Sequence, residues 1–196
     1  MSARDLILGR LRATQHRLPD PVAPYRPEAP ADLGAALAAR ARAVFATAEE
    51  ITSLDDLPAA VARYLGPDIT TLAVAAELRH LAWSAAGLTP AAPPGRAAMA
   101  ASVAPVVGAI AETGTLILTS RDPHGPWPNL LADRHIAVVP RGLISATLEE
   151  AVARLAGNRL PRSLHLATGP SRTGDIEQTL ELGAHGAVAV HLVLTP

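Results

Sequence analysis

The sequence predicts an α/β fold with three layers, in which a mainly parallel β-sheet lies between helices. The first observation is that short apolar runs alternate with helical patterns along the chain. The second is that most of these runs are apolar throughout, as in strands buried on both faces of a parallel sheet. The third is composition, because 49% of the residues are hydrophobic and only 3% are aromatic, which indicates an aliphatic core.

Composition also excludes several classes of function. The chain of 196 residues fits one domain, with or without an N-terminal extension. Its formal net charge is -1 and it has no basic block, which argues against nucleic-acid binding. There are no cysteines, so this sequence offers no disulfide and no cysteine-held iron–sulfur or zinc site, and we expect no metal. Since no apolar run reaches transmembrane length, we expect a cytoplasmic protein.

Residues 1–30 are predicted to form an N-terminal helix and a proline-rich linker, and residues 31–196 the α/β domain. The helix covers 2–18, where Ser2 and Asp5 have the spacing of a capping box. Five prolines in 19–30 favour an extended linker. The helix either packs away from the domain, against a partner, or folds back onto its own domain.

Within the domain, the apolar patterns, together with glycine and proline residues that end helices and strands, define the expected elements. Helices are predicted at 32–45, 53–65, 77–83 and 147–156, and a proline-rich loop at 87–95. Strands are predicted at 50–52, 69–75, 115–119, 136–139, 164–167 and 188–194. We expect all of these strands except the short 50–52 to share one sheet with helices on both faces.

The most informative stretch is Thr168–Glu177, between the predicted buried strand Leu164–Ala167 and a helical pattern with Ile176 and Leu180 on one face. A strand-to-helix turn at the carboxyl end of a sheet is where α/β folds bind ligands. Such a turn exposes backbone N–H groups that attract anions, and a guanidinium adds a planar fork for carboxylate or phosphate. The residues concerned are Gly169, Ser171, Arg172, Thr173, Gly174 and Asp175.

Two interpretations of this stretch remain open. The polar side chains either bind a small anion, or they only cap the helix while Arg172 is a surface residue. Asp175 would compete with an anion for the same N–H groups, so we expect it to cap the helix or to orient Arg172.

Two further groups join the candidate site. Glu112 has apolar neighbours on both sides and is followed by Thr113 and Gly114 in the tight approach to strand 115–119. A buried carboxylate needs a partner or a raised pKa, so Glu112 is either an acid/base group or ligand contact, or a structural acceptor for backbone N–H groups. His185 follows the predicted end of a helix at Gly183, where a histidine either bonds exposed carbonyls or performs catalysis.

The chain lacks the dinucleotide-binding glycine fingerprint, the Walker phosphate loop, the zinc-protease helix motif and the G-x-S-x-G elbow. Instead, Ala109–Thr115, Gly169–Glu177 and Gly183–Gly186 resemble the signature blocks of the LUD domain family. The resemblance extends from about residue 30 to the end of the chain. One position departs from it, because Ala187 stands where family members usually have proline, which puts the local turn geometry in doubt.

The resemblance implies a fold like that of the sugar-phosphate isomerase and CoA-transferase superfamily. It also implies a role in oxidising L-lactate to pyruvate, together with two partner proteins that carry iron–sulfur clusters. This chain would then be a non-redox subunit without a cofactor of its own and not catalytic alone. Its expected ligand residues are Glu112, Thr113, Gly114, Gly169, Ser171, Arg172, Thr173, Asp175 and His185.

Two alternatives stand beside that reading. In the first, the chain is a self-sufficient isomerase-like or transferase-like enzyme, with Glu112 or Asp175 as base or nucleophile and His185 as a further catalytic candidate. In the second, it is a purely structural subunit whose motif residues are caps.

Overall fold

The computed structural model describes residues 2–13, 28–92, 99–120, 125–156, 161–174 and 180–196. Its helices are α1 (Ala3–Ala13), α2 (Leu33–Ala43), α3 (Leu57–Leu65), α4 (Trp127–Leu131) and α5 (Leu148–Ala156), with short 3-10 turns at Leu54–Asp56, Ala76–Leu78, Trp83–Ala86 and Arg141–Leu143. Its strands are β1 (Thr47–Glu50), β2 (Thr71–Val74), β3 (Thr89–Ala91), β4 (Met99–Pro105), β5 (Gly108–Ile110), β6 (Thr115–Thr119), β7 (Ala132–Pro140), β8 (Ile144–Ser145), β9 (Leu164–Thr168), β10 (Arg172–Gly174), β11 (Leu180–Leu182) and β12 (Ala189–Thr195).

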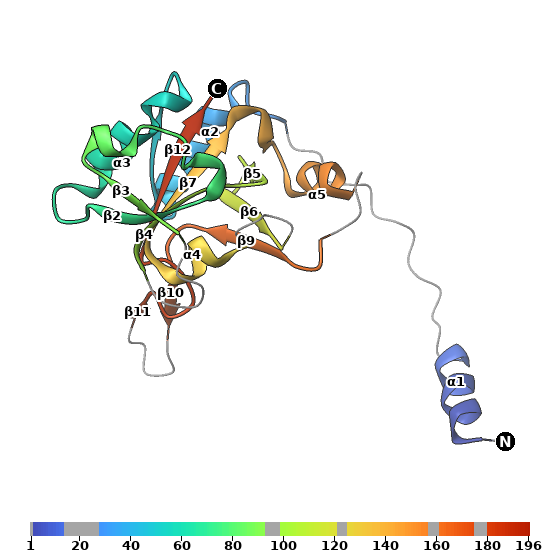
Figure 1. Ribbon diagram of the computed structural model, residues 1–196. Helices are drawn as coiled ribbons and strands as arrows, with labels where there is room; N and C mark the ends of the chain where they lie inside the picture. Colours follow the sequence, from blue (N-terminus) through green and yellow to red (C-terminus); the bar gives the residue numbers. More distant parts are fainter. Residues whose placement is uncertain (1, 14–27, 93–98, 121–124, 157–160, 175–179) are drawn as a thin grey trace.

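The centre of the fold is a six-stranded sheet in the order β1-β12-β7-β4-β2-β3, and every neighbouring pair in it is parallel. Strands β7 and β12, long and adjacent, are both interior strands of this sheet (Figure 1). Most of their buried residues are aliphatic, which is why these segments have largely apolar sequences, although His135 and His191 are buried as well. The predicted α/β class with a mainly parallel sheet is confirmed.

A second sheet of four strands, in the order β8-β5-β6-β9, packs against one face of the first. Its pairs β5·β6 and β6·β9 are antiparallel, and β5·β8 is parallel. Strands β10 and β11 form a separate antiparallel hairpin. We therefore correct the expectation of a single sheet, because Thr115–Thr119 and Leu164–Thr168 lie in this second sheet. An apolar run fits a strand buried between two sheets as well as one between helices.

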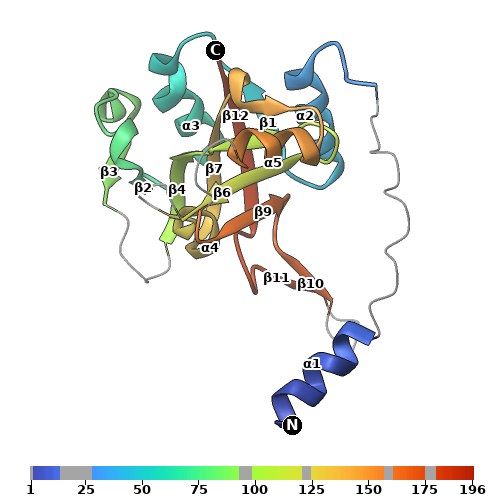
Figure 2. The ribbon, with the colours of Figure 1, turned by 90° about the vertical axis from the view of Figure 1, so that its right-hand side faces the viewer.

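The two faces of the central sheet are covered differently. On one face, α3 and the 3-10 turns around Leu78 and Trp83 bury the larger aliphatic cluster. On the other face, α2 and the second sheet pack together, with Leu37 and Leu116 among the buried side chains. Helix α5 then covers the outer side of the second sheet, where it lies in front of β6 in Figure 2. The second sheet thus takes a place that the prediction gave to helices.

The predicted helices 32–45 and 53–65 agree with α2 and α3. Asp32 caps α2 by accepting a hydrogen bond from the Ala35 N–H at 3.0 Å, and Ser53 with Asp56 forms a capping box before α3. Ser2 and Asp5 exchange hydrogen bonds at the start of α1, which stands apart from the two sheets in Figure 1. The predicted strand 50–52 is shifted to β1 (Thr47–Glu50), and the predicted loop 87–95 contains β3. In the described part of the chain, no helix is long and apolar enough to cross a membrane.

The helix predicted after the Thr168–Glu177 stretch is wrong where the structure describes it. Arg172–Gly174 is a strand that pairs with Leu180–Leu182, so the motif begins a hairpin rather than a helix. Asp175 and Ile176 lie outside the described residues. Strand β9 was also expected to be buried, yet Leu164 is 41% exposed and Leu166 is 48% exposed, because β9 is at the edge of its sheet.

Candidate functional site

Most of the predicted ligand residues meet in one groove of about 520 Å³, which follows β9 along its length and is called here the β9 groove. Its walls come from β9, from α4, from the loop into the β10–β11 hairpin and from the loop before β12. The lining residues are Asn129, Leu130, Leu164 to Thr173, and His185 to Ala187. The short segment with Gly169, Ser171, Arg172 and Thr173 therefore shares one cavity with His185, which comes later in the chain.

Ser171 holds the two loops of this groove together. Its N–H donates to the Ala187 carbonyl at 2.8 Å, and its own carbonyl accepts from the Gly183 N–H at 3.1 Å. Its Oγ accepts from the His185 N–H at 3.2 Å. These bonds use the Ser171 backbone and one lone pair of its hydroxyl, which leaves the hydroxyl proton to donate to a ligand. The imidazole of His185 is exposed at the groove.

The position that departs from the family pattern has a structural role of its own. The Ala187 N–H donates to the Asn129 carbonyl at 2.9 Å, and Ala187 is buried. Proline has no N–H, so it would lose this bond between the loop and α4. The turn is therefore held by a bond that a proline could not form. Asn129 also lines the groove, and no sequence pattern predicted this position.

Two glycines bring the motif blocks against α2. Gly169 has φ +73° and lies so close to Val44 that an added Cβ would overlap the Val44 carbonyl oxygen. Gly114 also has φ +73°, and an added Cβ would be 2.7 Å from the Ala41 nitrogen. Both positions thus require glycine for backbone conformation and for close approach. Their role in the structure is to dock the two blocks on the C-terminal part of one helix.

A chain of hydroxyl groups connects the same blocks. Thr113 Oγ1 is 2.6 Å from Thr115 Oγ1, which is 2.7 Å from Thr168 Oγ1. Thr115 and Thr168 face one another in the β6·β9 ladder. The Glu112–Gly114 turn is therefore anchored to the start of the groove motif.

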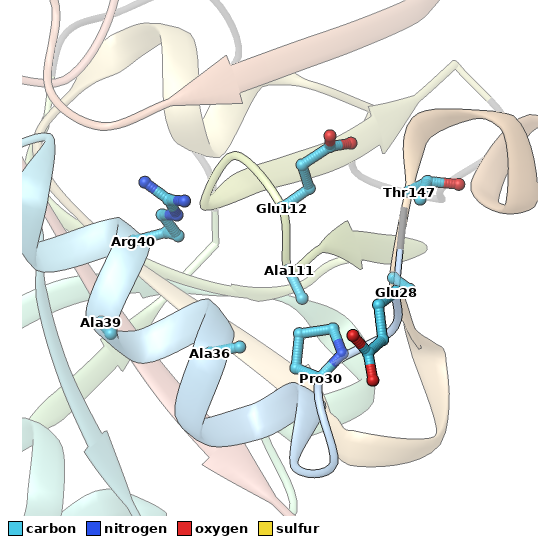
Figure 3. A pocket seen from close by; sticks show the side chains of 9 residues that line it. Glu28, Pro30, Ala36, Ala39, Arg40, Ala111, Glu112 and Thr147 are labelled. Atoms are coloured by element: carbon cyan, nitrogen blue, oxygen red, sulfur yellow. The ribbon is translucent and has the colours of Figure 1, made fainter. Parts of the chain in front are cut away.

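Glu112 itself does not line the β9 groove. It lines a separate pocket of about 360 Å³ together with Glu28, Arg40 and Thr147, over a floor formed by Pro30 and alanines. Figure 3 shows Arg40 extending from α2, Glu112 from the turn before β6 and Thr147 from the segment before α5. The Glu112 N–H donates to the Ala146 carbonyl at 3.1 Å, which fixes the turn. The expectation that Glu112 joins Arg172 in one pocket is therefore not met.

Arg172 has an aromatic partner that the sequence did not reveal. Its Cζ lies 3.7 Å from the ring centroid of Phe45, which follows the end of α2. This is a cation–π geometry. Sequence analysis placed Phe45 only as the last residue of a helix, and no pattern within the chain connects it with residue 172.

A second polar cluster lies at the edge of the central sheet, away from the groove. His191 Nδ1 is 2.7 Å from Thr47 Oγ1, its Nε2 is 3.1 Å from Glu49 Oε1, and its ring stacks on Tyr64. Burial lowers the pKa of His191 below its ordinary value, against the opposing effect of Glu49. Burial likewise raises the pKa of Tyr64. The cluster joins β1 to β12 and α3, so we assign it to the stability of that edge.

No group of three or more histidine, aspartate or glutamate side chains in the described ranges is arranged to hold a metal ion. Thr173 lines the groove from β10, while Asp175 lies outside the described residues. The chemistry of the described groove is therefore that of one guanidinium, the imidazoles of His165 and His185, hydroxyl groups and backbone amides, which suits a small anion.

The part of the chain that holds the β9 groove matches a known family model. Residues 101–195 match the LUD domain model. Just under half of the chain is thus similar to the LUD domain. The matched region contains most of β4 and all of β5 to β12, and thus the second sheet and the lining of the β9 groove.

The curated relatives carry the name lactate utilization protein C. The protein of Geobacillus kaustophilus is 34% identical over 92 residues, which are 44% of this chain and 38% of the relative. That of Bacillus licheniformis is 35% identical over 91 residues, or 43% of this chain and 38% of the relative. The match thus spans about two fifths of the length of these relatives.

A crystal structure of a DUF162 family protein from Deinococcus radiodurans has the same fold. It superposes with a TM-score of 0.61 at 25% sequence identity, and covers 87% of this chain and 100% of that chain. The likeness therefore extends beyond the region of the family match and includes much of the central sheet.

Proposed function

We propose that this chain takes part in lactate utilization as the non-redox subunit of an L-lactate-oxidising complex, and that the β9 groove binds the carboxylate of a small anion such as lactate or pyruvate. The names of the relatives support the metabolic role. The observation that carries the site is the convergence of Ser171, Arg172, Thr173 and His185 on one groove. Fixed donors around a guanidinium fork are the usual means of holding a small carboxylate.

The redox chemistry belongs to partner proteins in this proposal. The sequence has no cysteine, so iron–sulfur clusters with thiolate ligands would be held by the partners. This chain would supply binding and orientation of the anion. Arg172 would neutralise the carboxylate, while the Ser171 hydroxyl and the His185 ring, which also line the groove, would bond the ligand's remaining oxygens.

The test is Arg172→Lys, which keeps the charge and removes the planar fork. Loss of one charge-assisted hydrogen bond costs about 1.5–3 kcal/mol, so pyruvate or L-lactate should bind about ten- to a hundredfold more weakly by calorimetric titration. Thermal stability should barely change, because Arg172 is exposed. Arg63→Lys is the matched control, since Arg63 is also exposed and its partner Glu49 is remote from the groove lining.

The reconstituted complex distinguishes the proposal from its rivals. Co-purification with cluster-bearing proteins, and a loss of lactate oxidation with Arg172→Lys, is the expected result. Turnover by the isolated chain that depends on Glu112 would instead favour a self-sufficient isomerase or transferase using the second pocket. An Arg172→Lys variant that melts early and binds normally would show that Arg172 is structural and that the groove is not the site.

A further inference from the structure

Phe45 adopts a backbone conformation that its residue type disfavours. Its φ is +69°, and it is the only non-glycine residue with positive φ in the described part of the chain. The left-handed region is strained for a bulky L-residue, and such strain persists only where the surrounding structure or the function requires it.

The backbone at this point explains the angle but not the side chain. The Phe45 N–H donates to the Arg42 carbonyl, and the Ala46 N–H donates to the Ala41 carbonyl at 2.9 Å. These two bonds form a Schellman motif, in which the left-handed position is usually glycine. The end of α2 would therefore form at least as well with glycine or asparagine at residue 45.

Burial does not account for the phenyl ring either. Phe45 is 64% exposed, so its ring contributes little to the core. The contact recorded for the ring is the Arg172 guanidinium, 3.7 Å from the ring centroid. None of the ion pairs recorded among the described residues includes Arg172. Within the described part of the chain, the aromatic face is thus the observed contact that holds this guanidinium.

The stacked geometry also limits how a ligand can bind. One face of the guanidinium is covered by the ring, so a ligand reaches its N–H groups through the edges of its plane. A carboxylate can lie in that plane and make two parallel bonds.

We propose that Phe45 is a positioning residue of the β9 groove, which holds Arg172 so that a carboxylate approaches the edge of its guanidinium. The inference rests on the proposed function, since it assumes that Arg172 binds an anion. It adds a residue from outside the family-matched region and it names the side of the guanidinium from which the ligand binds. The strain at residue 45 is then retained for recognition at the expense of stability.

The experiment compares Phe45→Asn with Phe45→Tyr in the full chain. Asparagine tolerates the left-handed conformation and removes the ring, whereas tyrosine keeps the ring. Phe45→Asn should melt at the wild-type temperature or above it. Its affinity for pyruvate should fall about two- to fivefold, the loss expected for a cation–π contact at an exposed site. Phe45→Tyr should bind like the wild type, because it keeps the aromatic face under Arg172.

The outcomes separate this inference from the proposed function. If Arg172→Lys weakens pyruvate binding and Phe45→Asn does not, the groove is the site and the role of Phe45 is refuted. If neither variant changes pyruvate binding, the proposed function fails as well. Phe45→Asn melting several degrees below the wild type would show that the ring is a structural anchor, and equal losses in Phe45→Asn and Phe45→Tyr would also overturn the proposal.

Discussion

Gly114→Ala is expected to destabilise the fold by loosening the contact between the second sheet and α2. The added Cβ would stand 2.7 Å from the Ala41 nitrogen and 2.8 Å from the Arg40 carbonyl carbon. Both are backbone atoms of α2, so neither can turn away as a side-chain tip would. Helix α2 cannot withdraw freely, because Leu37 and Ala41 are fully buried between the sheets.

The magnitude follows from two contributions. A left-handed conformation costs a residue with a Cβ about 1–2 kcal/mol. Overlap with packed backbone adds about 1–3 kcal/mol, as other insertions into a close-packed interior do. The total is about 2–5 kcal/mol in the free energy of unfolding. At 2–4 °C per kcal/mol for a chain of this length, the melting temperature should fall by roughly 4–20 °C.

Gly87→Ala provides the matched control. Gly87 has φ +74° and no atom within 4 Å of its virtual Cβ, so it carries the conformational cost without the overlap. Both variants should be unfolded in urea and followed by circular dichroism, and the free energies of unfolding compared. Gly114→Ala should lose about 1–3 kcal/mol more than Gly87→Ala. Equal losses would refute the reasoning, because the overlap of the added Cβ with the α2 backbone would then have no measurable energetic cost.

Two other predictions concern stability. Burial lowers the pKa of His191 below 6.5, so near that pH the unfolded chain binds a proton that the native chain does not. The free energy of unfolding should therefore fall as the pH drops below about 6.5, until the native His191 is protonated as well. His191→Phe should reduce the difference in the free energy of unfolding between pH 7.5 and pH 5.5, measured in urea. The ionisable groups around His191 are Glu49, Arg63, Tyr64 and Arg134. If the difference stays the same in the variant, groups other than His191 cause it. Leu37→Ala should lower the free energy of unfolding by about 2–5 kcal/mol, because Leu37 is fully buried. Leu54→Ala should lower it much less, because Leu54 is already 36% exposed. Similar losses in the two variants would contradict the placement of α2.

The sequence by itself determined the class of the fold and many of its local features. Apolar runs such as 136–139 and 188–194 became interior strands of a parallel sheet, because a strand buried on both faces is largely apolar. The helix starts near 32 and 53 were predicted, since a helix start depends on residues close together in the chain, such as the caps Asp32 and Ser53. The same locality applies to Gly114, whose positive φ belongs to a tight turn.

Only the tertiary structure decided which strands share a sheet and which motif residues share a pocket. Thr115–Thr119 has the same apolar character as the central strands, yet it lies in the second sheet, because hydrophobicity records burial and not the identity of the covering layer. Leu180 has the spacing of a helix but pairs as a strand with Gly174. The stack of Arg172 on Phe45 joins residues far apart in the chain, and such a contact exists only once α2 and the hairpin have docked.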